Sequence, residues 1–196
     1  MLHIHTLTLG AYQVNCYVVH RDGCDRCVVI DPGYEPEQIL EFLQENGLRL
    51  EAVLLTHGHF DHVGGVRMLA ADTGCKVFSH HAEQTLPPQM TAGPLYYTDT
   101  YPANGKISVA GMDFLVFHTP GHTPGSVCLL TEDALFSGDT LFAGSCGRTD
   151  FPGGDWASMT VSLHRLRDLP GEYRVFPGHG EKTTLQKEQR SNPYMG

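Results

Sequence analysis

Four side chains of the kinds that bind metal ions lie within six consecutive positions of this chain. They are His57, His59, Asp61 and His62, in the pattern His-x-His-x-Asp-His. In an extended loop, alternate residues point to the same side, so His57, His59 and Asp61 are expected to converge. His62 follows directly, where its ring can face a second centre. Imidazoles and a carboxylate gathered this closely favour a divalent metal site, because the metal holds the rings in their neutral form.

Three further candidate ligands lie beside glycines at the ends of short apolar runs. His122 lies in the segment Thr-Pro-Gly-His-Thr-Pro-Gly, Asp139 in Ser-Gly-Asp-Thr, and His179 in Pro-Gly-His-Gly. The neighbouring glycines allow the backbone segments to approach a common point. Together with the first cluster, the candidates comprise five histidines and two aspartates. A set of this kind suits two metal ions that share one carboxylate.

The composition fits a folded protein and argues against several classes of function. Apolar residues make up 41% of the 196 residues and charged residues 18%, which excludes a disordered or fibrous chain. The formal net charge of −9 disfavours binding along nucleic acid. The sequence has no apolar run long enough to span a membrane, and its N-terminus lacks the pattern of a secretory signal. With its six cysteines interpreted as reduced thiols, we expect a cytoplasmic protein without nucleic-acid or membrane partners.

Strands and helices must position these candidate ligands. Helical spacing of apolar residues predicts helices over 36–46, 63–73 and 156–169, and a helical tail from Leu185. Strand-type runs are expected at 2–9, 14–20, 27–30, 52–55, 76–79, 106–109, 113–117, 126–131, 134–136 and 173–176. The pattern predicts an α/β fold in which helices cover two sheets, within a single domain.

Two other segments carry polar or reactive side chains outside the ligand set. Residues 85–105 form a long stretch rich in proline and glycine, which is typical of a functional lid. Its Tyr96 and Tyr97 either line the entrance for a substrate or anchor the loop on the sheet. Cys24 and Cys27 lie in a predicted hairpin turn and have no second cysteine pair, so we expect an exposed pair of thiols rather than a structural zinc site.

The candidate ligands, in this order and at these gaps, resemble the pattern of the metallo-β-lactamase superfamily. The resemblance runs from about residue 31 to residue 180 and implies an αββα four-layer sandwich with its metal site at one edge of the two sheets. It implies a first metal held by His57, His59 and His122, a second metal held by Asp61, His62 and His179, and a bridging Asp139. Asp31, in the segment Val-Ile-Asp-Pro-Gly, would orient the ligand loop. The two ions are expected to be zinc, with iron or manganese as alternatives.

Residues 137–155 are similar to the glyoxalase II branch, whose short bacterial members are the nearest match. This resemblance implies hydrolysis of a small-molecule thioester such as S-D-lactoylglutathione. Two metals lower the pKa of a shared water and supply a bridging hydroxide as nucleophile, which Asp61 would orient, and a thiolate leaves readily. Glyoxalase II itself grips glutathione with a C-terminal helical domain, whereas 16 residues follow Gly180 here. We therefore expect one domain over residues 1–196, with the thiol carrier held by Arg148 and the tyrosine-bearing loop, or a thiol other than glutathione. Arg148 can alternatively pair with Asp150 or Asp155.

Other functions are compatible with parts of the same pattern. The segment Cys-Gly-Arg-Thr-Asp-Phe at residues 146–151 also resembles persulfide dioxygenases, in which His57, His122 and Asp139 would hold a single iron. A single iron with oxygen uptake would indicate the dioxygenase, and two metals with thioester cleavage the hydrolase. Three other functions each predict a feature that this sequence does not show. A secreted β-lactamase is expected to have a signal peptide, and a tRNA-processing nuclease is expected to have a basic arm. A non-catalytic metal-binding scaffold is expected to have lost some of the ligands.

Overall fold

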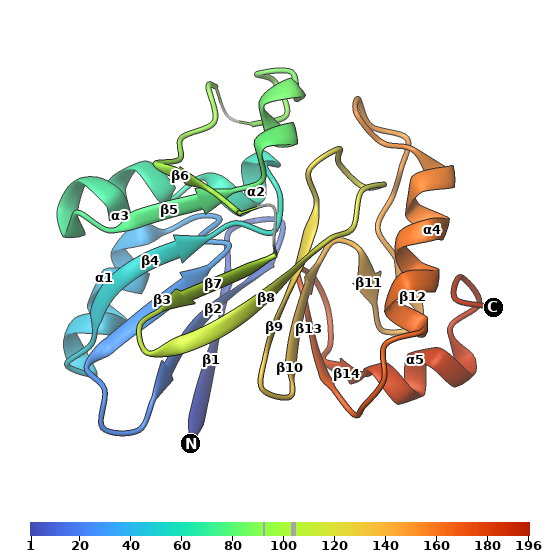
Figure 1. Ribbon diagram of the computed structural model, residues 1–196. Helices are drawn as coiled ribbons and strands as arrows, with labels where there is room; N and C mark the ends of the chain where they lie inside the picture. The colour runs from blue at the N-terminus through green and yellow to red at the C-terminus, as the bar shows by residue number, and fades with distance from the viewer. Residues whose placement is uncertain (92, 103–104) are drawn as a thin grey trace.

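Two β-sheets packed face to face form the centre of the protein, and helices lie on their outer faces (Figure 1). The computed structural model describes residues 1–91, 93–102 and 105–196. Helices α1 (Pro36–Glu45) and α3 (Val66–Thr73) lie outside the first sheet, and α4 (Trp156–Arg167) and α5 (Leu185–Ser191) lie outside the second. The predicted αββα arrangement is therefore confirmed.

The first sheet has the strand order β1-β2-β3-β4-β5-β6. Its strands are β1 (Leu2–Leu9), β2 (Val14–Arg21), β3 (Arg26–Ile30), β4 (Arg49–Leu54), β5 (Lys76–Ser79) and β6 (Asp99–Thr100). The pairs β1–β2 and β2–β3 are antiparallel, and the later pairs are parallel. Parallel neighbours need crossover connections, and these contain α1 (Pro36–Glu45), α2 (Phe60–Val63), α3 (Val66–Thr73) and the 3₁₀ helix η1 (His81–Thr85).

The second sheet has the order β14-β13-β10-β9-β8-β7. Its strands are β7 (Lys106–Val109), β8 (Met112–His118), β9 (Val127–Thr131), β10 (Ala134–Gly138), β13 (Arg174–Pro177) and β14 (Thr183–Thr184). Its neighbours are antiparallel except for β10 and β13. The small hairpin β11 (Leu141–Phe142) and β12 (Ser145–Cys146) precedes α4 (Trp156–Arg167), and α5 (Leu185–Ser191) lies near the C-terminus.

Three groups of buried apolar side chains match the four layers. One group, which includes Tyr17, Phe114 and Phe136, fills the space between the two sheets. A second lies between the first sheet and α1 and α3, and a third lies between the second sheet and α4 and α5. Because both faces of each sheet are covered, the central strands are apolar on both sides, as the continuous apolar runs in the sequence indicate.

The structure differs from two of the local predictions. The helix predicted over 63–73 begins later, at Val66 of α3, and Val63 instead ends α2. Gly64 and Gly65 separate the two helices, because they pack against the backbone of Pro32 and Gly33, and Gly65 N–H donates to Pro32 O at 2.8 Å. The prediction of two exposed thiols is wrong for Cys27, which is buried in β3. Burial raises the pKa of the Cys27 thiol to about 12.

The predicted lid segment 85–105 includes positions 92, 103 and 104, which lie outside the described residues. Within its described part, Met90 O accepts a hydrogen bond from Phe60 N–H at 2.7 Å. This bond ties the segment to the start of α2. Among the helices of the described chain, we find none that is long and apolar enough to cross a membrane.

Candidate metal centre

The candidate ligands meet where both sheets end on the same side of the sandwich. The first ligand cluster follows β4, and the His122 loop leads into β9. Asp139 and His179 follow β10 and β13. A backbone hydrogen bond from Val127 N–H to Thr56 O, at 2.8 Å, joins the two sheets at this edge. Both sheets therefore determine the position of the site.

One group of ligand atoms is formed by His57, His59 and His122. All three side chains are buried, and one ring nitrogen of each lies within 4.8 Å of the others. His59 Nδ1 lies 2.8 Å from His122 Nε2. The rings of His57 and His59 are nearly perpendicular, at 86°. Ring nitrogens that converge from different directions suit one tetrahedral or octahedral ion.

A second group is formed by Asp61, His62 and His179, which lie at the edge of the same region. His62 Nε2 lies 3.3 Å from His179 Nε2. Asp61 Oδ2 lies 3.2 Å from His179 Nε2 and 3.9 Å from His62 Nε2. His62 is fully buried, whereas Asp61 and His179 are partly exposed. This group is therefore more exposed to solvent than the first group, whose three side chains are all buried.

Asp139 lies between the two groups. Its Oδ1 lies 3.4 Å from His62 Nε2, and its Oδ2 lies 3.5 Å from His122 Nε2 and 3.7 Å from His179 Nε2. The neighbouring backbone at Gly178 comes so close that a Cβ there would contact Asp139 Oδ1 and lie 2.7 Å from His62 Cε1. This carboxylate can therefore face one ion of each group.

Main-chain carbonyl groups fix the tautomers of two of these histidines. His122 Nδ1–H donates to Arg148 O at 2.7 Å, and His179 Nδ1–H donates to Tyr12 O at 3.1 Å. A carbonyl oxygen can only accept, so the proton of each neutral ring lies on Nδ1. The Nε2 lone pair of each ring is then directed at the centre of the site, as a metal ligand requires.

Asp31 fixes the tautomers of His62 and His57 by a longer chain of hydrogen bonds. Its Oδ2 accepts from His62 Nδ1–H at 3.0 Å and from the Thr56 hydroxyl at 2.6 Å, and its Oδ1 accepts from Thr56 N–H at 2.8 Å. Because the Thr56 hydroxyl donates to Asp31, its oxygen is free to accept from His57 Nδ1–H at 3.1 Å. In the neutral form of each ring, Nε2 of His57 and Nε2 of His62 are thus left as lone pairs.

The two groups differ in their electrostatic surroundings. Burial, and then the neighbouring imidazoles, place the pKa of His57 well below its usual value and that of His59 at about 4. Burial also lowers the pKa of His62, but the nearby carboxylates, Asp139 first, outweigh it and raise the value to about 9. His57 and His59 are therefore held as neutral imidazoles, whereas His62 lies among negative charges.

These residues fit a pair of metal ions. His57 Nε2 and Asp139 Oδ1 are buried and find no hydrogen-bond partner in the described part of the chain. Buried polar atoms without partners are costly, so such atoms normally face a ligand. A cation supplies that partner for the lone pairs and balances the carboxylates. The described residues contain three groups with metal-ligand spacing, the two above and one of Asp31, His57 and His62, in which Asp31 already binds His62 Nδ1.

An open cavity of about 640 Å³ lies over the ligand groups. Asp61, Asp139, His59, His122 and His179 contribute to its floor. Its other lining residues are Tyr12, Phe60, Met90, Phe142, Ser145, Cys146, Arg148 and Phe151. Its walls therefore combine apolar side chains with one cation. The sequence indicated none of Tyr12, Phe60, Met90 and Phe142 individually, although Met90 lies in the predicted lid segment and Phe142 in residues 137–155.

The structure distinguishes between the alternatives for Arg148 and for the two tyrosines. Arg148 borders the cavity and also forms a two-bond ion pair with Asp150, with both bonds at 2.7 Å. Asp155 instead caps α4 by accepting from Ser158 N–H. Tyr96 and Tyr97 are absent from the cavity lining and pack against the core beside α1 and α3, which favours the anchoring role over the entrance.

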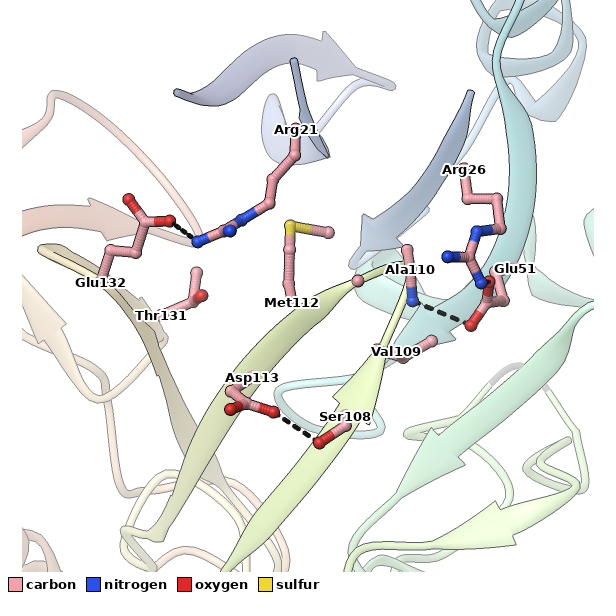
Figure 2. A pocket seen from close by; sticks show the side chains of 11 residues that line it. Arg21, Arg26, Glu51, Ser108, Val109, Ala110, Met112, Asp113, Thr131 and Glu132 are labelled. Atoms are coloured by element: carbon pink, nitrogen blue, oxygen red, sulfur yellow. Dashed lines mark hydrogen bonds and ion pairs between the residues drawn. The ribbon is translucent and has the colours of Figure 1, made fainter. Parts of the chain in front are cut away.

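A second cavity of about 570 Å³ lies at the opposite end of the strands. Figure 2 shows its lining residues, with Arg21 paired to Glu132 and Ser108 donating to Asp113. Arg26 on its wall is paired with Glu51 at 3.0 Å. Since these charges are already paired with each other, the cavity over the histidines is the better candidate for chemistry.

The fold and the ligand groups define a metal-binding protein built as a four-layer α/β sandwich. Residues 9–179 match the model of the metallo-beta-lactamase superfamily, and the chain belongs to this superfamily. Relatives include hydroxyacylglutathione hydrolase GloC of Haemophilus influenzae, which is 34% identical over 99% of this chain and 98% of its own length. A hydroxyacylglutathione hydrolase of an Enterobacter species is 38% identical over 90% of this chain and 66% of its own length.

Solved structures are similar over nearly the whole chain. BLEG-1 B3 metallo-beta-lactamase superposes with a TM-score of 0.91 at 35% identity and covers 98% of this chain and 99% of its own. TTHA1623, solved in a di-iron-bound form, has a TM-score of 0.82 at 40% identity over 97% and 99%. ETHE1 from Myxococcus xanthus has a TM-score of 0.86 at 29% identity over 97% and 83%. The chain thus shares its superfamily with proteins named hydrolases.

Proposed function

We propose that this protein is a metal-dependent hydrolase that cleaves small-molecule thioesters, with S-D-lactoylglutathione as the first candidate substrate. The observation that carries the proposal is the pair of ligand groups that share Asp139 on the floor of an open cavity. The names of the Haemophilus and Enterobacter relatives support the choice of a hydroxyacyl thioester.

Two divalent ions, with zinc as the expected metal, would be held by the two groups. His57, His59 and His122 would hold the first ion, Asp61, His62 and His179 the second, and Asp139 would contact both. Such a pair of ions polarises a carbonyl oxygen and supplies a water of lowered pKa at neutral pH. The di-iron form of TTHA1623 supports a two-metal site in proteins of this kind and leaves iron as an alternative.

Asp61 is the proposed catalytic carboxylate. It is partly exposed, and its side chain borders the cavity beside His179. From this position its carboxylate can accept a hydrogen bond from an attacking water and orient it toward a carbonyl carbon. A thiol leaving group has a pKa of only about 8.5, so it departs as thiolate with little help from an acid. The site therefore needs no separate proton donor for this reaction.

Arg148 and the apolar wall are the proposed contacts for the substrate. The Arg148 guanidinium lies 3.8 Å from the Phe151 ring centroid, and two of its N–H groups bind Asp150. A guanidinium has five N–H donors, so the remaining donors are available to a substrate carboxylate at the rim. Met90 and Phe142 supply apolar surface for the rest of the molecule.

A mononuclear-iron persulfide dioxygenase is the second candidate. The observation that favours it is the similarity to ETHE1 at 29% identity over 97% of this chain. In that reaction His57, His122 and Asp139 would hold a single iron. His179 then has no ligand role, which provides a direct way to separate the two candidates.

The test combines metal analysis with a substrate panel. Protein purified without chelators is expected to contain two metal ions per chain and to cleave S-D-lactoylglutathione under nitrogen. His179→Gln is expected to lose one ion and most of the turnover, whereas His164→Gln, at a partly exposed position of α4, keeps both.

One iron per chain, together with oxygen uptake on glutathione persulfide that persists in His179→Gln, would support the dioxygenase instead. A two-metal protein that cleaves no thioester from a panel of thiols would overturn the substrate assignment. A β-lactam in the same panel covers the activity named for BLEG-1.

A further inference from the structure

A buried glutamate outside the ligand set joins the two loops that carry the first ligand group. Glu83 lies in η1 and is only 1% exposed. Each of its carboxylate oxygens accepts a hydrogen bond from a glycine amide. Gly58 N–H donates to Oε2 at 2.5 Å, and Gly125 N–H donates to Oε1 at 2.6 Å. One side chain therefore binds two segments that lie far apart in the sequence.

These two glycines belong to the loops of the first ligand group. Gly58 lies between His57 and His59, and Gly125 lies three residues after His122. A Cβ at Gly58 would lie 2.9 Å from Glu83 Oε2, and a Cβ at Gly125 would lie 2.7 Å from Oε1. Neither loop has room for a side chain at these positions, so each backbone is built directly against the carboxylate.

The buried Glu83 carboxylate receives its hydrogen bonds from groups of the protein. Burial raises the pKa of Glu83, while hydrogen bonds from Thr123, Gly125 and Gly58 act in the opposite direction. A buried carboxylate is costly unless its oxygens accept hydrogen bonds, so the bonds to the two loops stabilise its position as much as it stabilises theirs. Glu83 is not part of the cavity lining, and thus it does not contact a substrate there.

We propose that Glu83 is a positioning residue that sets the separation between the His57–His59 loop and the His122 loop, and so controls the affinity of the first metal ion. The inference rests on the two-metal centre of the proposed function. The second ligand group is held by other contacts, from Asp31 to His62 and from the Tyr12 carbonyl to His179. Loss of the Glu83 bridge is therefore expected to weaken one ion and spare the other.

Glu83→Gln tests this at nearly constant volume. Its amide places an NH₂ group against one of the two glycine N–H donors, so one bond of the bridge is lost. Glu188→Gln is the matched control, because Glu188 is equally buried in α5 and accepts from Gly144 N–H at 2.7 Å. Each zinc-loaded protein is titrated with a chromogenic chelator, and the released zinc is counted per chain. Hydrogen exchange of the Gly58 and Gly125 amides is measured in the metal-free proteins.

In Glu83→Gln, one zinc equivalent is expected to be released at a roughly 10- to 100-fold lower chelator strength, and the other at the wild-type value. The Gly58 and Gly125 amides are expected to exchange faster in this variant, and Glu188→Gln is expected to match the wild type in both measurements. If Glu83→Gln does not fold, Glu83→Asp takes its place, since its shorter side chain cannot reach both amides.

A wild-type release profile in the Glu83 variant would overturn the inference and leave the two-metal centre intact. Equal weakening in the Glu188 control would also overturn it, because the effect would then be a general loss of structure. A wild-type protein that binds no zinc or iron would instead overturn the proposed function, and this inference with it.

Discussion

Asp31→Asn alters the hydrogen bonds that orient two candidate ligand histidines, and it adds no strain to the backbone. Asp31 has a φ of 51°, in the left-handed region that asparagine also tolerates. The asparagine Oδ1 can still accept from Thr56 N–H, but an NH₂ group replaces the oxygen that accepts from His62 and from the Thr56 hydroxyl. The His62 Nδ1–H group and the Thr56 hydroxyl, which are both donors, then face the NH₂ group, which is also a donor.

Each rearrangement that removes this clash between donors changes the proton position on a candidate ligand histidine. His62 can accept at Nδ1 only if its proton moves to Nε2, which removes the lone pair aimed at the site. If the Thr56 hydroxyl turns away from position 31, it donates to His57 Nδ1 and has the same effect on that ring. Loss of such an orienting partner typically lowers metal affinity about 10- to 100-fold, which corresponds to roughly 1.4–2.7 kcal/mol.

The assay is competitive zinc titration of wild type and Asp31→Asn against a chelator, with circular dichroism to check folding. Asp133→Asn is the control, because Asp133 forms an exposed ion pair with Arg174 far from the ligands. Nitrogen chemical shifts of the zinc-loaded proteins report which ring nitrogen of His62 carries the proton, because the nearby carboxylates raise the pKa of the metal-free ring to about 9. Wild-type affinity for both ions, or a His62 proton still on Nδ1, would refute the tautomer argument.

Three further outcomes are expected. Arg148→Ala should raise KM for anionic thioesters by about 10- to 100-fold, because a hydrogen bond to a charged group contributes about 1.5–3 kcal/mol. The KM for uncharged thioesters should change little. An unchanged KM for anionic thioesters in steady-state kinetics would contradict the assigned contact. Metal at a concentration of 1,000 times Kd stabilises the folded protein by about 4 kcal/mol. Removal of this metal with a chelator should therefore lower the Tm of the wild type by roughly 8–16 °C, and calorimetry with and without chelator checks this. Burial and the neighbouring His118 and His81 lower the pKa of His80 to about 4. Because the unfolded value is near 6.5, the folded chain binds fewer protons, so stability should fall as pH drops from 6.5 toward 4. His80→Asn keeps an acceptor for Ala82 N–H and should flatten this dependence in urea unfolding; an unchanged slope would contradict it.

The fold could be predicted because its pattern is local. The central strands appear in the sequence as continuous apolar runs, and their two covered faces explain why. The order of the strands within each sheet carries no such local signal. The break between α2 and α3 depends on Gly64 and Gly65 meeting the backbone of Pro32 and Gly33, a contact between separate segments. Cys27 belongs to the same class, because its burial depends on the elements packed over β3.

The ligand candidates could be found because histidine and aspartate carry their chemistry in the side chain, and their spacing made the group visible. The residues that orient them were harder to predict. Glu83 stands in a segment with no motif, and its role depends on amides of two distant loops. The acceptors of His122 and His179 are main-chain carbonyls, which any residue type supplies. Only Asp31, which acts through its side chain, could be assigned an orienting role from the sequence, through the resemblance.

The separate roles of side chains and main-chain carbonyl groups in this site have a consequence for substrate specificity. Arg148 and Tyr12 accept hydrogen bonds from two candidate ligand histidines through their carbonyl groups, and the same two residues line the cavity. A change of either side chain therefore alters the surface that a substrate meets, while the hydrogen bond that fixes the ligand tautomer remains. Metal binding and substrate choice can vary independently in such a site. Such independent variation is compatible with the different names, hydroxyacylglutathione hydrolase and metallo-beta-lactamase, that similar chains carry. It also requires that Arg148→Ala change KM without changing the number of metal ions bound, which ties the substrate prediction to the geometry of the metal centre.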